Sequence, residues 1–144
     1  MTHLATFLVA VFVFAASQYL LKLVLEPIQE HRRIVGCVAS YLLRNQAKIT
    51  NATPDFAISS EAHRLAADLW GSASAIFGYK FFCLLKVFGL QPRSALLNAS
   101  RELNLIAALL HPGNPDSRNA AECVGAVRRI GELLDVPTSY EGFV

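Results

Sequence analysis

Histidine, cysteine and serine are the side chains in this sequence that could support catalysis or bind a metal. The histidines stand far apart and form no HExxH or His-x₃-His pair, which a helix-borne zinc site requires; they are His3, His31, His63 and His111. The serines occur in no GxSxG pattern, and the sequence has no glycine-rich phosphate loop. We therefore expect no catalytic residue, no metal and no cofactor.

The three cysteines are also widely separated. Cys37, Cys83 and Cys123 form no CxxC pair, and each lies among apolar or small residues, an environment that raises a thiol pKa. An odd count without metal spacing favours free thiols in a reducing compartment. A cysteine–histidine nucleophile is accordingly not expected.

Composition and charge exclude one further class of function. The chain has 144 residues, of which 53% are apolar, and a net charge of only +2. That charge provides no basic face of the size that binding to nucleic-acid phosphates requires. The apolar excess lies in the first 25 residues and in a second patch from Trp70 to Leu90. We predict no nucleic-acid partner, and no small-molecule substrate is evident.

The segment Leu4–Leu25 is the clearest feature of the sequence. Leu4–Ser17 contains no charge, and 22 helical residues would span roughly 33 Å, close to the hydrocarbon thickness of a bilayer. We therefore predict a single transmembrane helix with the lipid bilayer as its partner. Two alternatives remain: a signal peptide cut after Ala15-Ala16-Ser17, and a buried soluble helix. The apolar run has no preceding Lys or Arg, which disfavours the signal peptide.

Three polar residues occupy the inner third of this segment. Gln18 and Lys22 are four residues apart and share one helical face, with Ser17 beside it. Lipid cannot satisfy such groups, so they favour a partner helix or water. For Gln18 a homo-oligomeric contact or a polar lining is the functional interpretation. For Lys22 the favoured interpretation is ordinary interface placement, with its amine snorkelling to the headgroups.

Flanking charge predicts the orientation. No Lys or Arg precedes the segment, and several follow it: Lys22, Arg32, Arg33, Arg44 and Lys48. The positive-inside rule then places the N-terminus outside and the rest of the chain in the cytoplasm of an inner (plasma) membrane protein.

The remaining sequence predicts an all-α fold, in which the membrane helix is followed by a small bundle of four to five helices. We divide the chain into an anchor (1–25), a cytosolic helical bundle (26–136) and a C-terminal tail (137–144). The expected helices are Ile28–Lys48 after Pro27, a helix from Glu61 to about Gly78, Tyr79–Leu90, one from Pro92 to about Leu110, and one from Asn114 to about Asp135. A loop, Thr50–Ile58, precedes the helix that begins at Glu61, and Ser59 and Ser60 are the predicted N-caps of that helix.

The predicted helix Ile28–Lys48 has an amphipathic pattern. Ile28, Val35, Leu42 and Ile49 recur at intervals of seven, which indicates a packed face. Gly36 and Ser40 form a small-xxx-small pair that would permit close approach of another helix. The predicted helix–helix contacts are Ile28, Val35, Gly36, Ser40 and Leu42.

The segment Tyr79–Leu90 combines many aromatic residues with lysines. A core helix, an interfacial helix lying on the membrane and a second span from Leu69 to Leu90 are the alternatives. If this segment is an interfacial helix, its contacts with lipid would be Lys80, Phe81, Phe82, Leu85, Lys86 and Phe88.

The run Leu25-Glu26-Pro27-Ile28-Gln29-Glu30, following one N-terminal span, resembles small bacterial single-pass inner-membrane proteins with a cytosolic helical domain. The resemblance is sharpest over Leu25–Ser40 and architectural elsewhere. It implies a bacterial inner-membrane location and supplies no catalytic residues.

We expect a membrane-tethered interaction module that binds a partner or itself, and not an enzyme. The alternatives are a membrane effector of the phage-defence type, whose spans assemble and perturb the bilayer, and an accessory subunit of a larger membrane complex.

Overall fold

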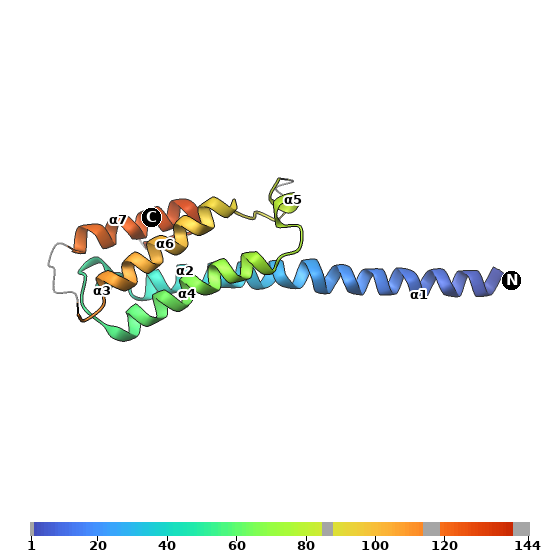
Figure 1. Ribbon diagram of the computed structural model, residues 1–144, viewed down its shortest axis with the longest axis horizontal. Helices are drawn as coiled ribbons and strands as arrows, with labels where there is room; N and C mark the ends of the chain where they lie inside the picture. The colour runs from blue at the N-terminus through green and yellow to red at the C-terminus, as the bar shows by residue number, and fades with distance from the viewer. Residues whose placement is uncertain (1, 85–87, 114–118, 140–144) are drawn as a thin grey trace.

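The computed structural model describes residues 2–84, 88–113 and 119–139. All the regular structure in these ranges is helical, as the sequence predicts (Figure 1). The elements in order are α1 (Thr2–Leu20), the π-helical turn η1 (Leu21–Leu25), α2 (Glu26–Arg44), α3 (Gln46–Thr50), α4 (Phe56–Ala75), α5 (Tyr79–Leu84), α6 (Arg93–Leu109) and α7 (Asn119–Leu134).

The helix α1 projects alone from the rest of the molecule (Figure 1). Its large apolar side chains are exposed, from 48% at Val11 to 74% at Phe12. In the part of the chain that the structure describes, it is the one helix long and apolar enough to cross a membrane, with a mean hydropathy of 2.1 over its best window and none of that window buried. The described part of the chain therefore does not bury this helix.

The helix does not break where α1 meets the packed part of the chain. A π turn, η1, joins α1 to α2, and the Glu26 N–H donates to the Leu21 carbonyl five residues back. Pro27 explains the wide turn: its ring would clash with the Leu23 carbonyl in a regular α-helix, and it has no N–H to donate to that carbonyl. Pro27 thus sits in the first turn of α2 inside one continuous helical path.

The path ends at Arg44, before the predicted end at Lys48. Asn45 leaves the helical conformation, and its side-chain Nδ2 donates to the Tyr41 carbonyl at 3.0 Å. An asparagine that bonds the preceding turn competes with the helical backbone, which accounts for the early end. A separate short helix, α3, follows and places Ile49 in the core.

The four long helices after the anchor pack around a common apolar core. α6 lies between α4 and α7, and α2 packs mainly on α4. Their fully buried side chains include Val38, Leu42, Leu69, Leu96, Leu103, Ile106 and Ile130. On α2 the seven-residue pattern is buried at Ile28 and Leu42, while Val35 is half-buried.

Successive helices run in alternating directions, so the packed region has two distinct ends. The anchor-proximal end contains the start of α2, the end of α4, α5 and the start of α6 (Figure 1). The distal end contains the segment from Tyr41 to Glu61 and the last turn of α6, whose Leu110 carbonyl accepts from the Asp55 N–H at 2.9 Å.

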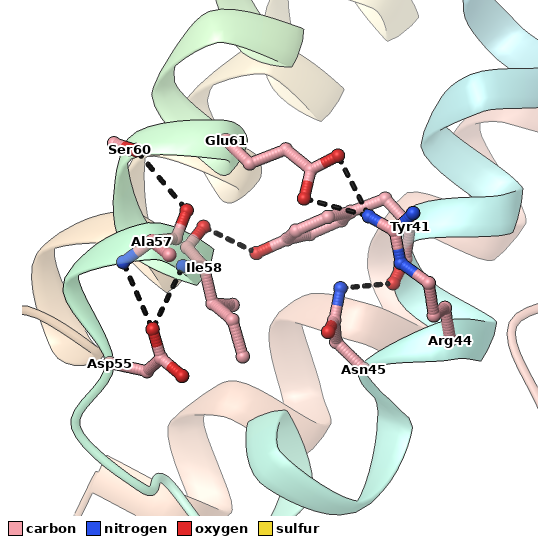
Figure 2. A network of polar contacts seen from close by, with 8 residues as sticks. All are labelled: Tyr41, Arg44, Asn45, Asp55, Ala57, Ile58, Ser60 and Glu61. Carbon is pink, nitrogen blue, oxygen red and sulfur yellow. Dashed lines mark hydrogen bonds and ion pairs between the residues drawn. The ribbon is translucent and has the colours of Figure 1, made fainter.

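Helix α4 begins at Phe56, five residues before the predicted start at Glu61 (Figure 2). Asp55 is the N-cap: its Oδ1 accepts from the N–H groups of Ala57 and Ile58 at 2.9 and 3.2 Å. The predicted caps are wrong, because the Ser59 hydroxyl donates to the Ala107 carbonyl of α6 and the Ser60 hydroxyl donates within its own helix. The extra turn also buries Ile58, which the later start would have left in a loop.

The same region ties α2 to α4 (Figure 2). The Tyr41 side chain is 1% exposed, and its hydroxyl donates to the Ile58 carbonyl at 3.0 Å. Burial raises the Tyr41 pKa well above its usual value. Arg44 Nη2 donates to both carboxylate oxygens of Glu61 at 2.8 Å. The distal end is therefore closed by contacts within the chain.

Candidate membrane-proximal surface

A buried histidine joins three elements at the anchor-proximal end. His31 of α2 is 2% exposed, its Nδ1 lies 2.8 Å from the Ser72 hydroxyl of α4, and its ring meets the Tyr79 ring edge-on with centroids 6.2 Å apart. Burial lowers the His31 pKa from its ordinary value. The sequence offered one signal for this role: His31 lies three residues after Ile28, on the apolar face of the helix.

Tyr79 fixes the start of α5. Its side chain is 2% exposed, its hydroxyl donates to the Gln91 carbonyl, and the Arg93 guanidinium lies 5.3 Å from its ring centroid. Burial raises the Tyr79 pKa to about 12. The Gln91 Nε2 in turn donates to the Leu134 carbonyl at the end of α7. These contacts hold α5 and the connection to α6 against the core.

The predicted helix Tyr79–Leu90 does not reach Leu90 in the structure. Helix α5 is described only to Leu84, and the backbone from Phe88 to Gln91 is not helical. Gly78 and Gly89 adopt positive φ angles of 69° and 61°, which glycine tolerates without strain, and these mark the turns before and after this segment. A second span from Leu69 to Leu90 is therefore wrong, since α4 ends at Ala75 and the chain turns before α5.

The segment around α5 exposes large apolar side chains. Phe77, Phe81 and Leu84 are 76%, 59% and 81% exposed, and we refer to these three residues as the apolar cap. Lys80 between them is also exposed. Phe77 and Leu84 were not among the predicted lipid contacts, because nothing in an uninterrupted apolar run distinguishes outward from inward residues.

The other predicted lipid contacts have different positions. Phe82 and Phe88 are half-buried and pack edge-on to each other, with ring centroids 5.8 Å apart. Leu85 and Lys86 lie outside the described residues. Of the predicted set, Lys80 and Phe81 are thus the described members that face outward.

The small pair on α2 does not contact another helix of this chain. Gly36 and Ser40 are exposed, and nothing lies within 4 Å of the position where a Cβ on Gly36 would be. The expected close approach is therefore absent among the described residues. Gly36 instead borders an open groove between α2, the segment Phe88–Gln91 and the residues that follow α7.

The polar residues of the anchor differ in how they are satisfied. The Ser17 hydroxyl donates to the Val13 carbonyl at 2.7 Å, so Ser17 needs no outside partner. Gln18 and Lys22 are exposed, and neither side chain has a hydrogen bond or ion pair to any other described residue. Of the predicted polar face, these two remain available for a contact.

Basic side chains are distributed unevenly between the two ends. At the distal end, Arg44 pairs with Glu61 and Lys48 pairs with Asp55 at 2.9 Å. At the anchor-proximal end, Arg33 pairs with Glu30 at 2.6 Å, whereas Lys80 and Arg93 have no ion pair within the ranges that the structure describes. The described residues also contain no group of three His, Cys, Asp or Glu side chains that could hold a metal ion.

Comparison with known proteins identified no relative, because no family model, curated protein or solved structure matches the chain.

Proposed function

We propose that this chain is a membrane-tethered helical interaction module. In this proposal, residues 4–25 cross the bilayer and the helices from α2 to α7 form a bundle at the cytoplasmic face of a bacterial inner membrane. There the bundle binds a protein partner or a second copy of the chain. The observation that supports this most directly is the exposure of α1: its apolar side chains pack on no other described element of the chain, and its length and hydropathy suit a bilayer.

The continuous helix supports a rigid connection between the membrane helix and the domain, in place of a flexible linker. Because α1 passes into α2 without a loop, the domain is held at a fixed distance from the anchor. Lys22 and the exposed Arg32 follow the apolar run, which supports the cytoplasmic placement of the domain.

Alkaline extraction of bacterial membranes, followed by intact-mass measurement, tests the tether. We expect the full chain to remain in the membrane fraction with residues 1–17 attached, and the domain to resist protease added outside spheroplasts. A protein shortened after Ser17 would instead establish a signal peptide. Digestion of the domain by protease added outside would show that the protein has the opposite orientation.

A membrane effector is the second candidate, and the exposed Gln18 favours it. An amide at this depth seeks another polar group, which a second copy of α1 would supply. Replacing Gln18 with Leu distinguishes the candidates. The effector loses bilayer permeabilisation and anchor-driven oligomers in Gln18→Leu. The tether keeps its partner binding in that variant, and loses it on charge reversal along the exposed face of α2, for example Arg33→Glu.

A further inference from the structure

We propose that the apolar cap, Phe77, Phe81 and Leu84, inserts into the interfacial layer of the same bilayer that α1 crosses, with Lys80 and Arg93 directed to anionic lipid headgroups. This gives the domain a second membrane contact beside the anchor. The proposal rests on the proposed membrane span of residues 4–25.

The position of α5 along the helix axis is the first argument. Tyr79, at the start of α5, packs on His31, which lies six residues beyond Leu25. Six helical residues rise about 9 Å. The polar layer on each side of a bilayer is roughly 5–8 Å thick, and interfacial helices bury their apolar face about 5–10 Å deep. With Leu25 at the hydrocarbon edge, the side chains of α5 are therefore within reach of the headgroup layer.

The chemistry of the cap is the second argument. Three large apolar side chains are more than half exposed within eight residues, although the same segment buries Tyr79 and half-buries Phe82. A contiguous exposed apolar surface on a protein marks a contact with another apolar phase. On this side of the domain, the nearest such phase is the bilayer that α1 crosses.

The charges agree with a lipid partner. Lys80 lies between the apolar residues of the cap, and Arg93 and Lys80 border an open, mainly apolar hollow between α5 and the start of α6. Neither has an ion pair within the described parts of the chain. The exposed acidic residues near this end lie outside that hollow; they are Glu26, Glu30, Glu132 and Asp135. Of these, Glu30 pairs with Arg33 and Glu132 pairs with Arg128. Cations beside an apolar surface are the composition that binds anionic membranes.

Fluorescence quenching in vesicles tests the contact in the full chain. Trp70 is the single tryptophan, so Trp70→Phe provides a silent background for Phe81→Trp. The matched control is Phe56→Trp, because Phe56 is 66% exposed but lies at the distal end. Lipids brominated just below the headgroup should quench the Phe81→Trp protein several-fold more than the Phe56→Trp protein. Equal quenching of the two variants would overturn the proposal.

A third variant separates this proposal from the membrane span. Phe12→Trp, in the middle of α1, should be quenched by lipids brominated near the acyl ends if residues 4–25 cross the bilayer. If Phe12→Trp is not quenched, the span itself fails, and the cap proposal fails with it. If Phe12→Trp is quenched and Phe81→Trp is not, the tether stands and the cap proposal alone is wrong.

Lipid charge provides a further test. Vesicles containing 30% phosphatidylglycerol should increase quenching of the Phe81→Trp protein relative to purely zwitterionic vesicles, and Lys80→Glu should abolish that increase. An increase that survives Lys80→Glu would overturn the role of Lys80. If the tryptophan of Phe81→Trp is shielded equally in detergent and in vesicles, and the shielding grows with protein concentration, a second copy covers the cap and the lipid proposal is wrong.

Discussion

The distal and anchor-proximal ends of the domain treat their polar and apolar groups in opposite ways. At the distal end, the Tyr41 hydroxyl, the Arg44 guanidinium and the Asp55 carboxylate all bond to other groups of the chain. At the anchor-proximal end, Lys80 is exposed beside three large apolar side chains that are each more than half exposed. The distal end thus presents paired polar groups with one exposed phenylalanine, Phe56, whereas the anchor-proximal end presents a group of exposed apolar side chains beside cations that are unpaired within the described residues.

The two ends differ in how far they bury residues of the same type. Phenylalanine and leucine occur at both ends, and their burial depends on whether a neighbouring helix is present to pack on. Where α2, α4 and α6 meet, Leu42 is 1% exposed; beyond the last turn of α4, Leu84 is 81% exposed. Stability should therefore depend on the distal end, and membrane contact on the proximal end.

The same substitution at the two leucines tests that division and should have the largest effect. Leu42→Ala removes a fully buried side chain and leaves a cavity, so it should lower the free energy of unfolding by about 2–5 kcal/mol. Leu84→Ala should change it by less than about 0.5 kcal/mol, since exposed positions contribute little. Denaturant titration of the full chain in mild detergent, followed by circular dichroism, measures both. Equal losses would remove the distinction between the ends.

Two tyrosine hydroxyls give a smaller, matched comparison. Tyr41→Phe removes the donor to the buried Ile58 carbonyl and should cost about 1–2 kcal/mol of unfolding free energy. Tyr79→Phe removes the donor to the Gln91 carbonyl in a less enclosed setting, and should cost less than Tyr41→Phe in the same titration. A larger loss for Tyr79→Phe would show that the anchor-proximal end is the more tightly held one.

The pH dependence of His31 is the smallest effect, because it is absent at neutral pH. Burial holds the folded-state pKa of His31 below its ordinary value. As pH falls below about 6.5, the unfolded chain binds the proton first. The free energy of unfolding of the protein should therefore decrease as pH falls from about 6.5 towards the folded-state pKa of His31, and this contribution should stay level above pH 6.5. Denaturation at several pH values checks this, and His31→Gln should flatten the decrease. An unchanged slope in that variant would assign the effect to another group.

Much of the fold follows from sequence periodicity. The apolar composition of Leu4–Leu25 and the repeat through Ile28 and Leu42 are strong helical signals, and the structure has helices at both. Helix ends were less predictable, because several residues compete to cap a helix. Asp55, Ser59 and Ser60 are all suitable caps, and the burial of Ile58 that favours Asp55 depends on helices distant in sequence.

The exposed side chains of the anchor-proximal surface were not predictable from the sequence. The aromatic and lysine composition of Tyr79–Leu90 left a core helix and an interfacial helix as alternatives, and the turns at Gly78 and Gly89 decide which side chains face outward. His31 was missed because its partners, Ser72 and Tyr79, are more than 40 residues away in sequence. Such contacts exist only once the helices have packed.

The π turn at Leu21–Leu25 has a mechanical consequence, because it joins α1 to α2 without interrupting the helix. If residues 4–25 span a bilayer, α1 and α2 behave as one lever with its pivot at the membrane surface. A helix tilt of about 20° is ordinary in membranes, and over the 19 residues of α2 it would displace the far end sideways by about 10 Å. A change in bilayer thickness would then swing the distal surface while α5, close to the pivot, stays near the headgroups.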